Sequence, residues 1–320
     1  MKVRLGYVGG PGSMKEFRYS KTMTYKEYQK LGEETAKEKL DKIIKDNLTN
    51  LLKTLKMNHF YQITFYRLSS SMIPLATHPK ITFDYITPYQ KEWQKIAGYL
   101  AKHSMRMDMH PDQFCILNST KEEVVQKSIT YLNYHHNLLQ ALNLKNAKLI
   151  LHIGSGEGGK EASLKRFSDN FRRLPLNLKQ EIILENDDKI YTVKDTLKLC
   201  QELNIPMVLD YHHYLCLKKG EKLKDDLKEI FATWKNTGMP PKVHFSSPKS
   251  KKEFRSHSDY ANLSTFLKFL KEIEPFTDEV DIMLECKAKE EALFRLMRQL
   301  RFLTNVKIIN NTCFFYENKK

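Results

Sequence analysis

Cysteine is scarce in this sequence, and no two cysteines have the Cys-x-x-Cys spacing. The 320 residues include five cysteines, scattered along the chain at Cys115, Cys200, Cys216, Cys286 and Cys313. An odd, scattered set argues against a disulfide framework and against a zinc site made of thiolates, and it suits a reducing compartment. We therefore expect histidine and carboxylate side chains to hold any metal ion.

Long apolar runs are also missing. The chain has no run of about 18 apolar residues, which is the length that a conventional membrane span needs. The N-terminal stretch MKVRLGYVGG contains no apolar segment long enough for a signal peptide. No internal segment rich in proline, glycine and serine divides the chain into two parts. These absences predict a cytoplasmic protein with one main domain.

Apolar and basic residues, by contrast, are abundant. Hydrophobic residues make up 41% of the chain, with 17 Phe and 16 Tyr, which is enough to fill a substantial core. Lysine and arginine total 53 against 38 acidic residues, giving a net charge of +15. A surplus of this size favours a polyanionic partner, and nucleic acid is favoured over a membrane surface. The alternative is a generally lysine-rich surface with no such partner.

Eight short apolar runs recur along the chain, and a longer segment of helical periodicity follows each of them. The expected strands are Val3–Val8, Gln62–Leu68, Met105–Met109, Lys148–Ile153, Ile182–Glu185, Met207–Asp210, Lys242–Phe245 and Val280–Glu285. The expected helices are Tyr25–Met57, Thr87–Lys102, Lys121–Leu142, Glu161–Leu174, Val193–Leu203, Lys222–Trp234, Asp259–Glu272 and Lys289–Phe302.

Eight alternations within this length indicate an α/β fold, a closed (β/α)8 or TIM barrel in a single domain. An open doubly wound sheet is the alternative, because periodicity alone does not reveal closure. We place the barrel domain at residues 1–302 and a C-terminal extension at residues 303–320. The extension carries an apolar run, Thr304–Tyr316, which we expect to cover the outside of the barrel.

Polar side chains of the kinds that bind metal ions follow most of the expected strands. In chain order they are His110, His152, Glu185, Asp210, His213, His244, His257 and Glu285. The carboxyl ends of barrel strands converge on one face, so these side chains are predicted to meet in one pocket. A carboxylate such as Glu185, directly after an apolar run, is costly to bury unless it is paired or bound to metal. Any one of them alone has a structural alternative, and only the joint pattern indicates a metal site.

The chemistry of this set indicates which ions it suits. Imidazoles and carboxylates together are ligands of zinc, manganese or iron rather than calcium. Eight ligands exceed what one ion usually takes, so we expect a cluster of two or three ions. Such a cluster suits phosphodiester hydrolysis, because one ion lowers the pKa of a bound water while others hold the phosphate. The same ligands serve sugar isomerases, but the basic charge favours a phosphate-rich substrate.

Several motifs occur in the order and at the spacings of a known family. They are Leu5-Gly6-Tyr7, Tyr66-Arg67-Leu68, Ile73–Pro79, Met109–Phe114, Leu149–Gly154, Leu184–Asp188, Asp210–His213, Pro241–His244 and Met283–Lys289. On these residues the chain resembles the UV damage endonucleases along nearly its whole length. The resemblance implies a TIM barrel with a cluster of divalent ions, commonly manganese, with zinc, magnesium or cobalt as alternatives. It also implies nicking of DNA on the 5′ side of UV photoproducts, such as cyclobutane pyrimidine dimers and 6-4 photoproducts, and in some members cutting at abasic sites.

The resemblance also assigns the ligands of each ion. The three sets are His110 and His152, with Glu185 bridging to the next ion; Asp210, His244 and Glu285; and His213 and His257. Lys242 matches a lysine that can be carboxylated in this family, which would supply one more anionic ligand. The residues expected to act in catalysis are Glu185, Lys242 and His244.

Further residues are expected to contact DNA. Gln113 and Phe114 match a Gln-Tyr pair that probes the damaged duplex; phenylalanine keeps the stacking surface but loses the hydroxyl. Tyr7, at the end of the first expected strand, is placed at the substrate rim. The segment before His257 is basic and is expected to contact the DNA backbone, with a solvated loop as the alternative, through Lys249, Lys251, Lys252 and Arg255.

Together these features predict a metal-dependent DNA repair endonuclease. Its partner would be damaged double-stranded DNA, in the cytoplasm and associated with the nucleoid, with no membrane and no obligate protein partner. Three alternatives remain: an apurinic endonuclease, a metal-dependent sugar isomerase or epimerase on the same barrel, and a non-catalytic DNA-binding protein stabilised by metal.

Overall fold

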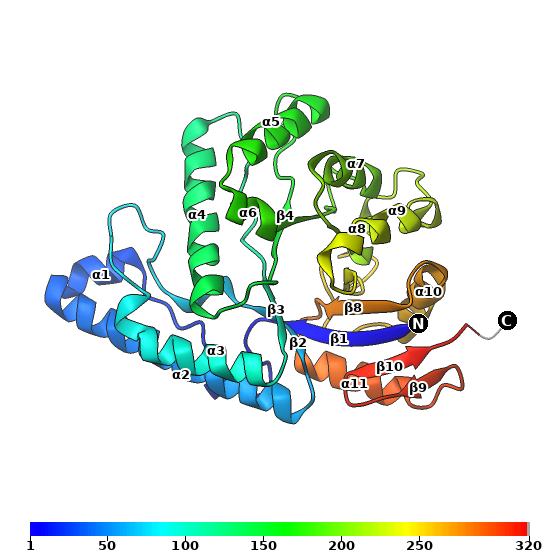
Figure 1. The fold of residues 1–320 in the computed structure, drawn as a ribbon, viewed down its shortest axis with the longest axis horizontal. Coiled ribbons are helices and arrows are strands. Elements are labelled where there is room, and N and C mark those ends of the chain that lie inside the picture. Colours follow the sequence, from blue (N-terminus) through cyan, green and yellow to red (C-terminus); the bar gives the residue numbers. More distant parts are fainter. Residues whose placement is uncertain (319–320) are drawn as a thin grey trace.

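The computed structural model describes residues 1–318, and its centre is a closed barrel of eight parallel strands (Figure 1). The strands are β1 (Lys2–Val8), β2 (Phe65–Leu68), β3 (Arg106–Met109), β4 (Leu149–His152), β5 (Ile182–Glu185), β6 (Met207–Asp210), β7 (Lys242–Phe245) and β8 (Glu279–Leu284). Each strand pairs with the next along the chain, and β1 pairs with both β2 and β8, which closes the barrel. The expected (β/α)8 barrel is confirmed.

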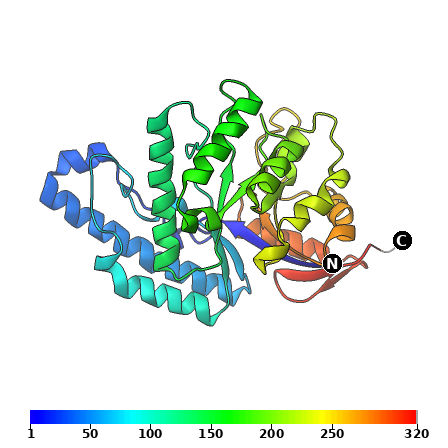
Figure 2. The same cartoon turned by 45° about the horizontal axis from the view of Figure 1, so that its top comes forward.

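Helices connect the strands and surround the barrel (Figure 2). They are α1 (Tyr25–Leu31), α2 (Glu33–Phe60), α3 (Gln90–Lys102), α4 (Glu122–Ala141), α5 (Lys160–Arg173), α6 (Leu176–Glu181), α7 (Val193–Leu203), α8 (Tyr211–Cys216), α9 (Leu227–Ala232), α10 (Leu263–Ile273) and α11 (Glu290–Leu300). Short 3-10 helices lie at Lys15–Phe17, Ser70–Met72, Thr87–Tyr89, Leu223–Asp225, Lys235–Thr237 and Glu274–Phe276. No helix within residues 1–318 has the length and apolarity needed to cross a membrane.

Some element boundaries agree with the sequence-based prediction and others differ. β5, β6 and β7 have the ranges that their apolar runs predicted. The expected helix Tyr25–Met57 is instead two helices, because Gly32 between α1 and α2 has a φ of 78°, outside the helical range. The expected helix Lys222–Trp234 is reduced to α9 and a preceding 3-10 turn.

The residues after α11 extend the barrel sheet. β9 (Val306–Ile308) and β10 (Cys313–Tyr316) form an antiparallel hairpin, and β10 pairs antiparallel with residues 2–4 of β1. β2 pairs with the other end of β1, at residues 7 and 8. Phe314 and Tyr316 are buried by this arrangement. The apolar run that we expected to cover the outside of the barrel is therefore part of its sheet.

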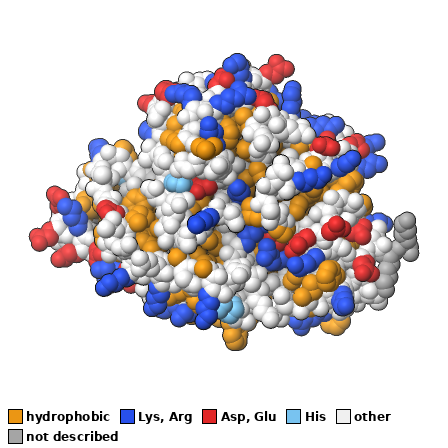
Figure 3. Space-filling view, in the orientation of Figure 1, with side chains coloured by type: hydrophobic (Ala, Val, Ile, Leu, Met, Phe, Trp, Pro, Cys, Tyr) orange, Lys and Arg blue, Asp and Glu red, His pale blue; other side chains and the backbone are white. Residues whose placement is uncertain are grey.

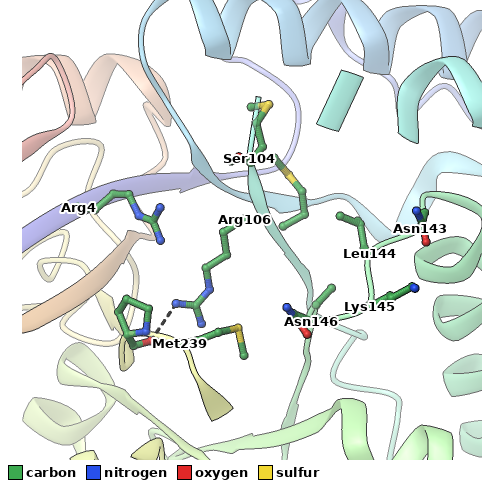
Figure 4. Close-up of a pocket in the computed structure, with 12 residues that line it drawn as sticks. Arg4, Ser104, Arg106, Asn143, Leu144, Lys145, Asn146 and Met239 are labelled. Atoms are coloured by element: carbon green, nitrogen blue, oxygen red, sulfur yellow. Dashed lines mark hydrogen bonds between the residues drawn. The ribbon is translucent and has the colours of Figure 1, made fainter. Parts of the chain in front are cut away.

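Buried charges fill the amino-terminal end of the barrel. Asp281 binds Arg4 Nε at 2.7 Å and Arg106 Nη1 at 2.6 Å, and Lys242 Nζ donates to Asp108 Oδ2 at 2.8 Å. β3 and β4 pair at a single position, and an opening of about 390 Å³ into which Arg4 and Arg106 point lies beside them (Figure 4). These charges are paired with one another and lie below the polar residues at the carboxyl end of the barrel.

Candidate metal centre

Strand register brings polar side chains together at the carboxyl end of the barrel. His152 and Glu185 are the last residues of β4 and β5 and lie side by side in the register, as do Asp210 of β6 and His244 of β7. His152, Glu185 and Asp210 each follow an apolar stretch whose side chains are buried, so the strand is anchored and its last side chain is held at the rim. Side chains at the ends of neighbouring parallel strands therefore converge here.

The first ligand group consists of His110, His152 and Glu185. Each offers one ligand atom, and these atoms all lie within 4.8 Å of one another. His110 Nε2 is 3.0 Å from Glu185 Oε2, and His152 Nε2 is 3.8 Å from the same oxygen. Two imidazole nitrogens facing one carboxylate oxygen are suited to enclose a divalent cation.

The second ligand group consists of Glu185, Asp210, His244 and Glu285, again with one atom each within 4.8 Å of the others. His244 Nδ1 lies 3.0 Å from Glu185 Oε1 and 3.0 Å from Glu285 Oε1. Glu185 thus presents Oε2 to the first group and Oε1 to the second. A carboxylate shared in this way is placed to bridge two neighbouring ions.

His213 and His257 lie next to these groups but belong to neither of them. His213 Nδ1 is 3.4 Å from Glu185 Oε1 and 2.9 Å from the Asn186 carbonyl oxygen. The rings of His213 and His257 are 6.2 Å apart, centroid to centroid. Six of the eight expected ligands are therefore brought together in two groups, and a third ion on the other two stays a prediction.

Several buried polar atoms of the centre have no hydrogen-bond partner among residues 1–318. They include Asp210 Oδ2, Glu185 Oε1 and His244 Nδ1, which belong to residues of the second ligand group; the last two atoms lie 3.0 Å apart without hydrogen-bond geometry. A buried polar atom that is left unsatisfied costs about 1–3 kcal/mol, so such atoms are rare unless something else binds them. A cation coordinated by this donor set would satisfy them, and the residues present therefore fit a metal ion.

The acidic members of the centre differ in their proton affinity. Burial raises the pKa of Asp210 to about 8, and the negative charge of Glu185 adds to this effect. Burial opposes ionisation of Glu185 too, but His244 and His152 hold its pKa well below the ordinary value. The Arg67 guanidinium, which binds Glu285, lowers the pKa of that carboxyl against the effect of burial. Glu185 and Glu285 are therefore held as anions, the form in which a carboxylate binds a cation, whereas Asp210 would lose its proton on binding one.

Lys242 lies one layer below the ligands. It precedes His244 by two residues on β7, is fully buried, and donates to Asp108. Burial lowers the pKa of its ammonium to about 8, with Asp108 opposing the shift. The amine that we expect to be carboxylated is therefore hydrogen-bonded to Asp108, and its modification stays a prediction.

The two residues expected to probe DNA lie beside the centre. Gln113 and Phe114 line a pocket of about 470 Å³ together with His110 and His152. Phe114 is 76% exposed, as Phe60 is, and what distinguishes it is its place beside the ligands. An exposed apolar ring next to possible ion ligands has the placement required of a wedge.

The basic segment lies at the same end of the barrel, joined to His257 by a bridge from Pro248. Two of its four cations are already in ion pairs, Lys249 with Glu253 at 2.7 Å and Arg255 with Asp188 at 2.6 Å. The other two, Lys251 and Lys252, are exposed. Basic side chains are spread over the whole visible face in Figure 3 rather than gathered in one patch.

The position of Tyr7 differs from the expectation. Its ring is fully buried, and its hydroxyl donates to Asn58 Oδ1 at 2.8 Å. β1 pairs with β2 at this residue, so the side chain packs beneath the rim rather than on it. A contact between Tyr7 and DNA would require the residues above it to move, and it stays a prediction.

Two residues of the centre were given no role from the sequence. Arg67, which binds Glu285, also lines the pocket. Asn186 holds the Asp210 backbone: its Oδ1 accepts from Asp210 N at 2.9 Å and its Nδ2 donates to Asp210 O at 3.0 Å. Both lie in motifs that the sequence singled out, at or directly after a strand end, which was the available signal.

The chain is similar to known proteins over nearly its whole length. A family model described as UV-endonuclease UvdE matches residues 3–317. The chain is 39% identical over 311 residues to the UV DNA damage endonuclease of Bacillus cereus (strain B4264), covering 97% of this chain and 98% of the relative. It is 40% identical over 302 residues to the UV DNA damage endonuclease of Bacillus pumilus (strain SAFR-032), covering 94% of each.

Solved structures give the same result. The crystal structure of SacUVDE is similar at a TM-score of 0.84 and 35% identity, covering 93% of this chain and 98% of that chain. Endonuclease IV from Thermus thermophilus has a TM-score of 0.55 at 14% identity, covering 93% of this chain and 97% of that one, which shows the fold alone. The fold and the ligand groups define a TIM-barrel protein with a histidine–carboxylate centre placed to hold metal ions. The chain belongs to the UV-endonuclease UvdE family.

Proposed function

We propose that this protein is a DNA repair endonuclease that nicks UV-damaged duplex DNA on the 5′ side of the photoproduct. The reaction would use two or three divalent ions, with manganese preferred over zinc, magnesium or cobalt. The observation that carries the proposal is the position of Glu185, which belongs to both ligand groups and can bridge adjacent ions. Membership of the family supports damaged DNA as the substrate. The likeness to L-ribulose 3-epimerase, with a TM-score of 0.52 at 14% identity, covers 97% of this chain and 90% of that one, but it concerns the fold alone.

The ligand residues would act by holding the ions and the reacting groups in place. When bound, the ions supply a hydroxide near neutral pH and stabilise the leaving oxygen. His110, His152 and Glu185 would hold one ion, and Glu185 with the second group would hold another. Glu185, Asp210 and His244 are buried, and a low-dielectric surrounding strengthens each charge interaction there. Lys242, if carboxylated, would add an anionic ligand one layer below His244.

Recognition of the lesion would rest on the two probe residues. Damaged base pairs cost less to unstack, so the exposed ring of Phe114 would enter the stack at the lesion. The amide of Gln113 would hydrogen-bond to the displaced bases. An abasic site lowers the same cost, and we include it as a substrate. Contacts of Lys251 and Lys252 with backbone phosphates would add affinity without sequence preference.

The test is nicking of a duplex that carries one cyclobutane pyrimidine dimer, with manganese or with a chelator, beside undamaged and abasic duplexes. We expect a chelator-sensitive cut directly 5′ to the dimer. Glu185→Gln should lower the rate by at least about a hundredfold, because even residues that only orient ligands typically cost 10- to 100-fold. Glu181→Gln is the matched control, because this buried glutamate pairs with His136 away from the centre.

Other results of these nicking assays would indicate a different function or mechanism. Cutting of the abasic duplex alone would make the protein an apurinic endonuclease. Equal rates for Glu185→Gln and Glu181→Gln would remove Glu185 from the mechanism. DNA binding without cutting under any divalent ion would leave only a binding role. We expect the protein to act in the cytoplasm, in association with the nucleoid.

A further inference from the structure

Lys289 stands at the rim of the metal centre and has no role in the proposed reaction. It follows β8 and immediately precedes α11. Its side chain lines the same pocket as His110 and His152. A lysine in this position is either a support for the neighbouring loop or a contact for the substrate.

The backbone of Lys289 is strained. Its φ is 52° and its ψ is −121°, a combination that glycine adopts readily and that other residues rarely adopt. Strain of this kind persists where the surrounding structure enforces it, and it is concentrated at functional sites. A glycine here would relieve the strain, so a lysine at this position indicates that its side chain is needed.

The ammonium group of Lys289 has a carbonyl partner and spare donors. Nζ donates to Gly10 O at 2.7 Å, and a Cβ built on Gly9 would lie 3.5 Å from Nζ. No carboxylate among residues 1–318 forms an ion pair with Lys289; the adjacent Glu290 instead accepts from Gly12 N and Ser13 N at 2.8 Å each. An ammonium has three N–H donors. The half-buried charge therefore remains without a counter-ion.

A second cation, Arg18, binds the same loop of residues 10–12. The exposed Arg18 donates from Nε to Pro11 O at 3.1 Å and from Nη2 to Gly12 O at 3.3 Å. Within the described part of the chain it too lacks a carboxylate partner. Both cations bind carbonyl oxygens of residues 10–12, which brings them close together. Burial and then the nearby Arg18 charge lower the pKa of Lys289, and the charge of Glu290 opposes the shift. An anion between the two cations would relieve their repulsion.

Lys289 and the two probe residues line the same pocket from different strands. Lys289 follows β8 and lies beside the end of β1, whereas Gln113 and Phe114 follow β3. β1 and β2 separate the two sides, and His110 lines the pocket on the β3 side. We place the lesion at Phe114 and the bond that is cut at the ligand groups. The DNA strand would then extend toward Lys289.

We propose that Lys289 and Arg18, held by the carbonyl groups of residues 10–12, form a subsite for a backbone phosphate of the damaged strand. The subsite rests on the proposed function, because it takes DNA as the substrate. Ammonium and guanidinium groups are the side chains that bind phosphate most strongly. The phosphate supplies the missing counter-ion and accounts for a strained lysine where glycine would fit.

The test measures binding apart from cutting. Binding of a duplex with one dimer is followed in chelator over a series of salt concentrations, for the wild type, Lys289→Met, Lys289→Arg and Lys2→Met. Loss of one phosphate contact should make the slope of the logarithm of the association constant against the logarithm of salt concentration less negative by about 0.9. It should also weaken binding by about tenfold. Lys289→Arg should keep the wild-type slope. Lys2→Met, at the other end of β1 and paired with Glu279, removes the same charge and should change nothing.

A glycine variant separates charge from structure. Lys289→Gly should show the same change in the salt-dependence slope as Lys289→Met. Its thermal midpoint should stay at or above the wild-type value, because the strain is released. A support role predicts the reverse, a lower midpoint with an unchanged slope, and that result overturns the subsite. An unchanged slope in Lys289→Met overturns it too. A wild type that shows no salt-sensitive DNA binding overturns the proposed function, and the subsite with it.

Discussion

At the scale of single residues, Phe114 is an exposed side chain of the site that we expect to probe the lesion. Phe114 exposes most of its ring at the edge of a pocket lined by two possible ion ligands. Its removal costs the folded state little, because the ring buries little surface. Any effect of a substitution on DNA binding is therefore separable from an effect on folding.

We expect Phe114→Ala to weaken binding of a dimer-containing duplex by about tenfold, since stacking of a base on an aromatic ring contributes about 1–3 kcal/mol. Binding of undamaged duplex and the thermal midpoint should stay at their wild-type values. Phe114→Tyr restores the ring and should bind like the wild type. Equal loss of affinity for damaged and undamaged duplex would show that Phe114 does not read the lesion.

Asn186 acts on the centre through another residue. Both of its side-chain hydrogen bonds go to the backbone of Asp210, and its own carbonyl oxygen contacts His213 Nδ1. Asn186→Ala should therefore lower manganese affinity by about 10- to 100-fold, the usual effect of losing a residue that orients a ligand. Calorimetric titration of manganese measures this. Asn146→Ala, at an exposed turn before β4, is the control, and equal affinities would contradict the role.

At the scale of elements, one glycine permits the barrel to close. β1 and β2 pair only at residues 7 and 8, and just before them a Cβ added to Gly6 would lie 2.4 Å from Phe65 O. Phe65 O is a backbone atom of β2, and a Cβ is fixed to the backbone of β1, so neither can move away without separating the two strands. The approach of β1 to β2 therefore depends on Gly6 having no side chain.

Gly6→Ala should destabilise the protein by about 3 kcal/mol, near the upper end of the usual cost of overpacking. Gly98→Ala in α3 is the matched control, because an added Cβ there meets nothing within 4 Å. Alanine is the better helix former by about 0.5–1 kcal/mol, so this control should be slightly stabilised. Urea unfolding of both variants measures the difference, and a Gly6→Ala protein as stable as the wild type would refute the packing argument.

At the scale of the whole molecule, charge pairs at the amino-terminal end connect strands that are far apart in the sequence. Asp281 of β8 binds Arg4 of β1 and Arg106 of β3, and it is completely buried. Removal of its charge would leave two guanidinium groups without their shared partner. Loss of one member of a buried ion pair is far more costly than loss of a surface pair.

We expect Asp281→Asn to lower the free energy of unfolding by about 3–5 kcal/mol. Asp169→Asn, which removes the partner of Lys165 in a surface pair on α5, should change it by less than about 1 kcal/mol. Denaturant unfolding of the two variants tests the contrast. A loss of similar size in both would show that the buried network contributes no more than a surface pair.

Strand positions and ligand types were predictable from the sequence because both are local. β5, β6 and β7 were predicted to the residue. β5 and β6 are short apolar runs that end in a carboxylate, and in β7 the apolar Val243 and Phe245 alternate with polar residues. The interruption at Gly32 was missed, because a single glycine within a helical pattern is usually tolerated. The pairing of the tail with β1 was missed as well, because it joins residues about 310 apart in the chain.

The sequence by itself determined the alternation of eight strands with helices and the kinds of ligand at the strand ends, because hydrophobic periodicity is enough for these. Closure of the barrel was decided by the pairing of β1 with both β2 and β8, which periodicity does not reveal. Only the tertiary structure decided that Tyr7 is buried and that Lys289 has no counter-ion. Those properties depend on register and on contacts between distant segments. The physical reason is that a strand's own sequence specifies which faces are apolar, whereas its neighbours specify what each side chain meets.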